Sequence, residues 1–342
     1  MTEPVGCLVV GLGRMGARHA QTVARSGQGA LAAVADPNAR RAAEVGERYG
    51  VAHYTDAEEA MDRSGARAVV IAASTDQHPA LVRAAIQRGL AVFCEKPLAL
   101  DLEASRRLAA DVERSGVPFQ LGLVRRYDPA YVEARERLAR GDIGRPLMYR
   151  AVDRDPAPPP RSFLAESGGI FRDMGVHDFD AASFLMGEEV CALTAAGLAT
   201  DPVFQEIGDF GEAHVAMRFA SGALGSIVLG RGAAYGFDLR VEVMGETGVL
   251  TVGGAGRHGF VALAEGERRA PAYVDYWDRL EEGFRREIAA FLDGVRRGAP
   301  LTPGAAEGVR ASTLAELATE AARSGQWIAC PGALPRDSAG AG

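Results

Sequence analysis

In Val5-Gly6-Cys7-Leu8-Val9-Val10-Gly11-Leu12-Gly13-Arg14-Met15-Gly16, a short apolar run leads directly into a glycine-rich turn, and a helical pattern continues to Arg25. The pattern predicts a strand, a turn and a helix. Glycines allow the tight turn, the close approach of backbone to a pyrophosphate and close helix-to-strand packing, while the helix N-terminus offers N–H groups to the anion. The predicted dinucleotide-binding residues of this turn are Gly11, Gly13, Arg14, Met15 and Gly16.

An acidic residue follows the second predicted strand. Asp36 directly follows the predicted strand Leu31–Ala35 and lies twenty residues beyond the glycine turn. A carboxylate at this place accepts hydrogen bonds from ribose hydroxyls and repels a 2′-phosphate, which favours NAD over NADP. Pro37 also suits a helix whose N-cap is Asp36, and the two roles are compatible. Because Arg40 and Arg41 follow closely and can hold a 2′-phosphate, use of NADP stays possible.

Strands and helices alternate as far as residue 123, which predicts a parallel sheet that binds its ligand at the carboxyl ends of the strands. Thr75 and His78 follow one such strand, and we predict that they contact the cofactor. A helix-cap role for the histidine is the alternative. Glu95 and Lys96 follow the next strand, where Pro97 fixes the turn and directs the ammonium towards the nicotinamide. The alternative for Lys96 is an exposed loop lysine.

A second stretch with residues suited to catalysis begins at the glycine pair Gly168-Gly169. The helical pattern runs on to Met186, with Gly187 as its stop. Residues four apart share one face of a helix, so Asp173 and His177 are predicted to be adjacent. A carboxylate that fixes a histidine's tautomer gives a general acid/base near neutral pH. The alternative is a pair in which the acids favour the helix dipole and the histidine only balances their charge.

Composition narrows the class of protein. The chain has 342 residues and a formal net charge of −7 without runs of lysine or arginine, so we expect no nucleic-acid partner. It contains no stretch of about 18 apolar residues, so we expect no membrane segment. The four cysteines are far apart and form no CxxC pair, which indicates buried reduced thiols, no metal site and a cytoplasmic location.

Two domains and a tail are predicted. Residues 1–123 form a nucleotide-binding domain, and residues 124–330 a second α/β domain that includes the two closing helices. Residues 331–342 lack apolar bulk and are predicted to be disordered. Alternating patterns joined by short glycine turns predict a mainly antiparallel sheet with an open face, made from strands at 214–219, 223–230 and 238–243.

Three motifs in this order resemble the Gfo/Idh/MocA family of nicotinamide-dependent oxidoreductases, and the resemblance covers nearly the whole chain. They are the glycine turn 11–16, Glu95-Lys96-Pro97, and Asp173 with His177. The stretch 168–180 and the segments 125–129 and 154–160 are most similar to the inositol 2-dehydrogenase branch.

The resemblance implies an N-terminal Rossmann domain and NAD-dependent oxidation of a secondary alcohol on a cyclitol such as myo-inositol, scyllo-inositol or an amino or deoxy derivative. It implies catalytic roles for Lys96, Asp173 and His177, with either the lysine or the histidine as base, and substrate contacts from these residues together with Arg126 and Tyr235. Packing alone also accounts for the tyrosine. The family pattern further implies a homotetramer or homodimer through the open sheet face.

Rival functions share this fold. A dehydrogenase of sugars or sugar derivatives carries the same three motifs, and some glycosidases on this fold keep NAD bound through each turnover. A sensor that binds NAD without turnover is the alternative from another functional class.

Overall fold

The computed structural model describes residues 4–254, 262–264, 267–269 and 271–331. The chain divides into two compact units, Met1–Tyr127 with Glu282–Arg310, and Asp128–Glu281 with Ala311–Gly342. The division differs from the sequence prediction mainly in the segment Glu282–Arg310, which was assigned to the second domain and packs with the first unit. Nearly all of the predicted disordered tail lies outside the described residues.

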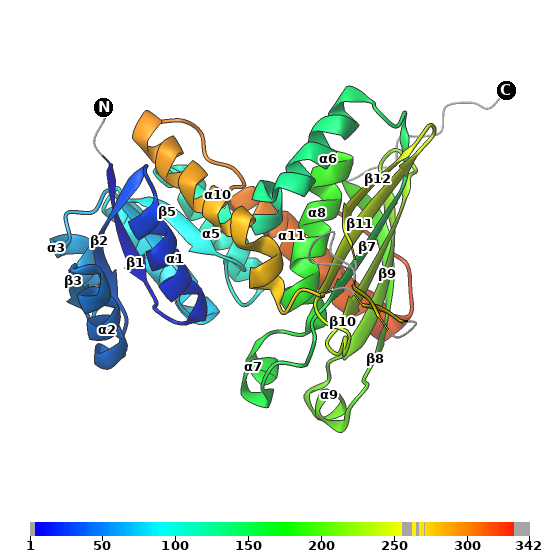
Figure 1. Ribbon diagram of the computed structural model, residues 1–342, viewed down its shortest axis with the longest axis horizontal. Coiled ribbons are helices and arrows are strands. Elements are labelled where there is room, and N and C mark those ends of the chain that lie inside the picture. Colours follow the sequence, from blue (N-terminus) through cyan, green and yellow to red (C-terminus); the bar gives the residue numbers. More distant parts are fainter. Residues whose placement is uncertain (1–3, 255–261, 265–266, 270, 332–342) are drawn as a thin grey trace. The chain divides into compact units, whose positions relative to one another are not determined.

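The first unit contains a parallel six-stranded sheet of order β3-β2-β1-β4-β5-β6 (Figure 1). Its strands are β1 (Val5–Val10), β2 (Gly29–Ala35), β3 (Ala52–Tyr54), β4 (Ala68–Ile71), β5 (Ala91–Glu95) and β6 (Phe119–Gly122). The connecting helices are α1 (Arg14–Arg25), α2 (Ala39–Tyr49), α3 (Ala57–Arg63), η1 (Thr75–Gln77), α4 (His78–Gln87), α5 (Leu102–Ser115) and η2 (Val124–Tyr127). The central strands are apolar on both faces because helices cover both, as is usual for parallel sheets. The predicted Rossmann arrangement is confirmed.

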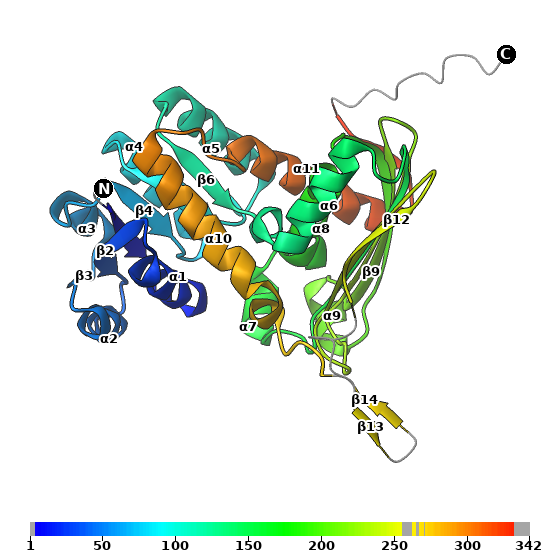
Figure 2. The same ribbon diagram turned by 45° about the horizontal axis from the view of Figure 1, so that its top comes forward.

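Helix α10 (Tyr276–Arg297) explains why a late segment belongs to the first unit. Alternate residues of β1 point to opposite faces, and Val5, Cys7 and Val9 share their core with residues of α1. Ile288, Phe291 and Leu292 of α10 complete this core. Figure 2 shows α10 lying along the same side of the sheet as α1. The opposite face has its own core, to which α3, α4 and α5 contribute.

The second unit contains a seven-stranded sheet of order β12-β11-β7-β10-β9-β8-β15, in which only β7 and β10 pair in parallel. Its strands are β7 (Pro146–Arg154), β8 (Val190–Leu198), β9 (Glu212–Phe219), β10 (Leu224–Gly230), β11 (Asp238–Gly245), β12 (Val249–Gly253) and β15 (Ile328–Ala329). A separate hairpin joins β13 (Ala262–Ala264) to β14 (Glu267–Arg269). The predicted mainly antiparallel sheet is confirmed.

Helices cover one face of this second sheet. They are α6 (Pro129–Arg140), α8 (Val176–Met186) and the second part of α11 (Ala305–Ser324), and their apolar residues share one core with the strands. Two shorter helices, α7 (Arg161–Glu166) and α9 (Pro202–Ile207), lie in the connections. Buried and more exposed residues alternate along β9, so the other face of the sheet carries the more exposed set.

The helix predicted from Gly168 begins differently from its sequence pattern. A π-helical turn (η3, Phe171–Gly175) precedes α8, and the helix ends as predicted at Gly187, which adopts φ 69°. Because a π turn winds more widely than an α turn, the four-residue spacing from Asp173 to His177 does not run through a regular α-helix. π turns inside α-helices occur frequently at functional sites.

All four cysteines are free and buried, as predicted. Among the described residues, every helix is too short or too polar to span a bilayer.

Two glycines of the first turn are required by packing. Gly11 has φ 82°, and a Cβ there would lie 2.6 Å from the backbone of Ala73. A Cβ on Gly16 would lie 1.6 Å from the carbonyl oxygen of Gly11. Gly13 differs, because an added Cβ would meet nothing within 4 Å.

We therefore expect Gly16→Ala to lower the free energy of unfolding by about 3 kcal/mol, because helix and strand must separate to admit the methyl group. Gly13→Ala, the matched control, should cost about 1 kcal/mol or less, the usual difference between glycine and alanine at an N-cap. Urea denaturation of both variants tests this, and equal losses would contradict the packing role assigned to Gly16.

Candidate functional site

The first unit carries a candidate cofactor-binding site at the N-terminus of α1. Gly13 is the N-cap residue and supplies no side-chain hydrogen bond, so the first N–H groups of the helix have no side-chain cap there. The space at its Cβ position is open, and Arg14 beside it is exposed. Anionic groups bind well at such a helix end. These features fit the pyrophosphate of a dinucleotide.

Asp36 ties the glycine turn to the end of β2. Its side chain is 3% exposed, and its two oxygens accept hydrogen bonds from the backbone N–H of Leu12 at 2.7 Å and of Asn38 at 2.9 Å. The guanidinium of Arg41 donates to it at 3.1 Å. The N-cap of α2 is Asn38, which accepts from the backbone of Arg41, so the predicted capping role of Asp36 is wrong.

His78 lies between two loops at the carboxyl edge of the sheet. Its Nδ1 is 2.8 Å from the carbonyl oxygen of Pro97 and its Nε2 is 3.1 Å from that of Ala73. The ring is 1% exposed, and burial lowers its pKa. The histidine thus connects the end of β4 with the cis Lys96–Pro97 peptide. This geometry favours a role in positioning the loop, while Thr75 lies nearby in η1 and is partly exposed.

Glu95 and Lys96 follow one another at the end of β5. The Glu95 carboxylate accepts a 2.6 Å hydrogen bond from Nε2 of the buried His19. Lys96 is partly exposed. Arg126, in η2 after β6, is also partly exposed and belongs to the same unit.

The second unit carries its own candidate group, on the η3–α8 helix. From Ile170 to Ser183 every residue is buried except Arg172, Asp173 and His177. Polar groups are seldom retained on a helix so enclosed by core unless they pair or react. The two predicted catalytic residues of this helix are therefore among the few that remain accessible to a ligand.

Arg231 was not predicted and is the main addition from the structure. Its side chain is fully buried, with Nη2 3.4 Å from the Asp173 carboxylate and 3.8 Å from that of Asp209. Asp209 in turn accepts a 2.9 Å hydrogen bond from the backbone N–H of Ile170. The guanidinium therefore lies between two carboxylates and places a permanent positive charge next to Asp173. The only sequence signal is a charged residue between glycines directly after the apolar β10.

Tyr235, predicted to contact substrate, is 62% exposed after β10. Its hydroxyl donates to the Asp238 carboxylate at 2.9 Å, and Arg240 donates to the same carboxylate at 2.7 Å. Partial burial, and then the bond to Asp238, raise the tyrosine pKa. Within the second unit the structure thus brings Asp173 together with Arg231 and Asp209, and Tyr235 together with Asp238 and Arg240.

We expect Arg231→Met to lower the free energy of unfolding by about 3–5 kcal/mol, because it leaves buried carboxylates without their cation. Arg240→Met is the matched control, since that guanidinium is 47% exposed and screened by water. It should cost about 1 kcal/mol or less. Denaturant titration measures both variants, and a loss at Arg231 as small as that at Arg240 would show that the buried pair does not hold this region together.

Two family models match the chain. Residues 5–123 match an oxidoreductase family with an NAD-binding Rossmann fold, and residues 131–251 match the GFO/IDH/MocA C-terminal domain. One match thus lies in each unit.

Relatives of similar length agree with these models. The scyllo-inositol 2-dehydrogenase (NAD(+)) of Bacillus subtilis is 36% identical over 302 residues, 87% of this chain and 88% of the relative. The myo-inositol 2-dehydrogenase of Thermotoga maritima is 36% identical over 295 residues, 85% of this chain and 88% of the relative. The crystal structure of Lactobacillus casei scyllo-inositol dehydrogenase with bound NAD(H) and scyllo-inositol matches with a TM-score of 0.90 at 25% identity, covering 96% of this chain and 99% of that one. The chain therefore belongs to the GFO/IDH/MocA family and is an oxidoreductase that acts on CH–OH groups, with an NAD-binding Rossmann domain.

Proposed function

We propose that this protein oxidises one secondary hydroxyl of a cyclitol, myo-inositol, scyllo-inositol or an amino or deoxy derivative, to the ketone, with NAD as the oxidant. The observation that carries the proposal is the pair Asp173 and His177, accessible on a helix that is otherwise almost wholly buried. The two inositol dehydrogenases that are 36% identical to this chain support the choice of substrate class.

The proposed chemistry divides the work among three side chains. His177, with Asp173 setting its tautomer, takes the proton from the substrate hydroxyl. Lys96 binds the same oxygen and stabilises the negative charge that develops there. When bound, the nicotinamide accepts the hydride from the carbon, so the alcohol loses two electrons and two hydrogens in total. Arg126 and Tyr235 are proposed to bind the remaining hydroxyls.

Asp36 supports NAD as the preferred cofactor. A buried carboxylate at the end of β2 repels a 2′-phosphate and suits a ribose hydroxyl. Arg41 contacts this carboxylate and moderates the repulsion, which leaves weaker use of NADP open. The remaining proposed cofactor contacts are Gly11, Gly13, Arg14, Met15, Gly16, Thr75, Glu95 and Lys96, whereas the buried His78, predicted as a contact, is proposed to position the loop that carries Lys96.

The test is to mix the purified protein with NAD or NADP and a panel of inositols, amino-inositols and simple sugars, and to follow nicotinamide absorbance. We expect reduction with an inositol, faster with NAD than with NADP. Reduction only with sugars would keep the mechanism and replace the substrate class. No net reduction by a protein that binds NAD would favour the glycosidase or the sensor over the dehydrogenase.

Two variants test the proposed catalytic residues within the same assay. We expect Lys96→Met and His177→Ala each to lower kcat at least about 100-fold, the usual contribution of one general acid–base or electrostatic group. Near-normal turnover in either variant would remove that residue from the mechanism.

We also propose that the open face of the second sheet joins copies of this chain into a tetramer or dimer in the cytoplasm. Val152, Ala216 and Val228 lie on outward-facing positions of neighbouring strands, although water reaches each of them only in part. Leu224 and Val249 on the same face are 49% and 55% exposed. A sheet face with so many apolar side chains is typical of an interaction surface.

Val228→Lys should convert the assembly to smaller species, because the charge would be buried in the contact. Leu100→Lys is the control, since Leu100 is 52% exposed and belongs to the first unit, which does not contain this sheet. Light scattering after size-exclusion chromatography gives the mass of each. A wild-type monomer, or an unchanged mass for Val228→Lys, would contradict the proposed surface.

A further inference from the structure

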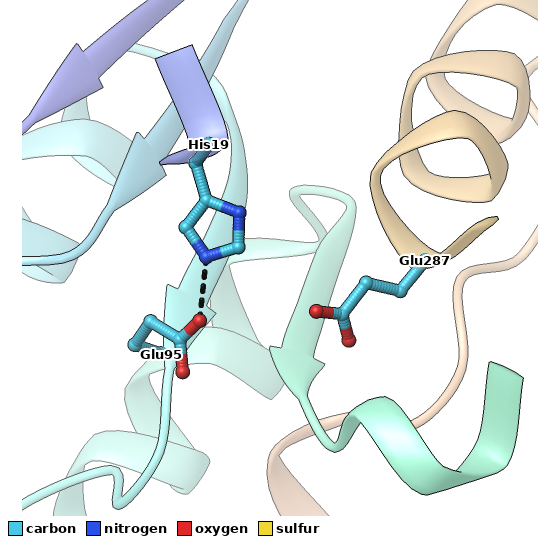
Figure 3. A group of neighbouring side chains, drawn as sticks. All are labelled: His19, Glu95 and Glu287. Carbon is cyan, nitrogen blue, oxygen red and sulfur yellow. Dashed lines mark hydrogen bonds and ion pairs between the residues drawn. The ribbon is translucent and has the colours of Figure 1, made fainter. Parts of the chain in front are cut away.

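Three ionisable side chains meet inside the first unit, away from the glycine turn. They are His19 of α1, Glu95 at the end of β5 and Glu287 of α10, and one ligand-type atom from each lies within 4.8 Å of the others (Figure 3). His19 and Glu287 are fully buried, whereas the Glu95 side chain is 12% exposed. Figure 3 shows the Glu287 carboxyl group directed towards the other two side chains.

Glu287 is the unusual member of this group. Among the described residues, neither of its carboxyl oxygens has a hydrogen-bond partner. An ionised carboxylate so enclosed would cost several kcal/mol without a cation or donors to stabilise it. Burial, and secondly the charge of Glu95, raise its pKa well above the usual value. These observations agree that Glu287 is a neutral carboxylic acid when Glu95 is ionised.

The proton on His19 can be placed from its contacts. Nε2 donates to Glu95 at 2.6 Å, while Nδ1 is buried without a partner among the described residues. A doubly protonated ring would leave a buried N–H donor unpaired, so the arrangement of lowest cost carries its only proton on Nε2. The ring packs edge-on against Phe93 and Phe284, with centroid distances of 5.4 Å and 6.3 Å.

A divalent cation is the alternative occupant of this group. Two ligands of one tetrahedral zinc ion, each about 2.0–2.1 Å from the metal, lie roughly 3.3 Å apart. The His19–Glu95 contact of 2.6 Å is shorter than this spacing and has the length of a charge-assisted hydrogen bond. The geometry therefore favours a shared proton over a metal ion.

Other groups surround Glu287 without neutralising it. Gln120 of β6 donates to the backbone carbonyl of Glu287 at 3.2 Å and not to its carboxyl group, whose neighbours are His19 and Glu95. Tyr127 of η2 has a raised pKa, chiefly because it is partly buried, and it therefore stays neutral. The positive charge of Arg126 lowers the pKa of Tyr127 and so opposes this rise. The group as a whole thus carries one negative charge, on Glu95.

We propose that His19, Glu95 and Glu287 form a buried proton-holding site that keeps a single negative charge at the end of β5, on the residue before Lys96, with Glu287 as the neutral acid. His19 fixes the Glu95 carboxylate at the end of β5, and Lys96 is the next residue in the chain. The effect on Lys96 rests on the proposed function, whereas the protonation of Glu287 does not. Two experiments separate these parts.

The first experiment needs no catalysis. The folded-state pKa of Glu287 is raised above its unfolded value of about 4.3. Its stabilising contribution is therefore complete below about pH 4.3 and is lost as pH rises towards and through the folded pKa. Glu287→Gln mimics the neutral acid and removes this loss. We expect the folding equilibrium constant of the variant, relative to wild type, to increase between about pH 4.5 and 7.5, by at most tenfold per pH unit.

Denaturant titration at several pH values measures this ratio. A ratio that stays constant with pH would show that Glu287 is ionised in the folded protein and would overturn the proposal. Stoichiometric zinc or manganese in the purified protein, lost in His19→Ala, would overturn it in favour of a cation site.

The second experiment compares the pH profiles of kcat/KM for wild type, Glu95→Gln and Glu287→Gln, with an inositol and NAD. Removing a negative charge beside an ammonium group makes the proton easier to lose. Glu95→Gln should therefore shift the pH profile of kcat/KM to lower pH. Glu287→Gln should leave the profile in place.

A similar shift in both variants would mean that Glu287 carries charge, and no shift in either would mean that the group does not act on Lys96. Both results overturn the proposal. If the wild-type protein oxidises none of the substrates, the proposed function fails, while the stability experiment still decides the protonation of Glu287.

Discussion

The first unit depends on covering one face of its parallel sheet. α1 and α2 pack on the side of β1 and β2, and the same face at β4 and β5 would expose Val70 and Phe93 to water without a further helix. α10 supplies that cover, and its Phe291 packs edge-on against Phe93 with centroids 5.8 Å apart. A segment more than 150 residues distant in sequence thus becomes part of the nucleotide-binding fold, and it brings Glu287 to the end of β5.

The second unit meets a related constraint at the η3–α8 helix. This helix is enclosed on nearly all sides, so each polar group on it needs a partner or a ligand. Arg231 provides the cation for Asp173 from the end of β10, and Asp209 fixes the start of the helix through the N–H of Ile170. The π-helical turn begins directly after Ile170 and contains Asp173, where the chain passes from a positive-φ glycine pair into regular α-helix. Such support suits a catalytic pair that must keep one geometry.

Local patterns were sufficient to predict the motifs, because each depends on residues close in sequence. The glycine turn, Asp36 after β2 and Lys96 after β5 follow from strand, turn and helix signals within a short span. The capping role of Asp36 was wrong because Asn38, two residues later, competes for the same helix end. Arg231 and Glu287 could not be predicted, since their significance arises from contacts between elements far apart in the chain. The π turn has no sequence signal comparable to a proline or a glycine.

The two units stabilise their enclosed carboxylates differently, because the second unit places a guanidinium beside them and the first unit an imidazole N–H. Asp173 and Asp209 have a buried guanidinium within 4 Å, and arginine keeps its charge in any protein environment, so this group holds a permanent cation beside its acids. Glu95 accepts from the single Nε2–H of His19, which can stabilise one carboxylate. The second carboxylate, Glu287, is the one proposed to hold a proton, because two enclosed negative charges would repel each other. The number of hydrogen-bond donors and cations that each unit supplies therefore sets how many negative charges its carboxylate group can hold.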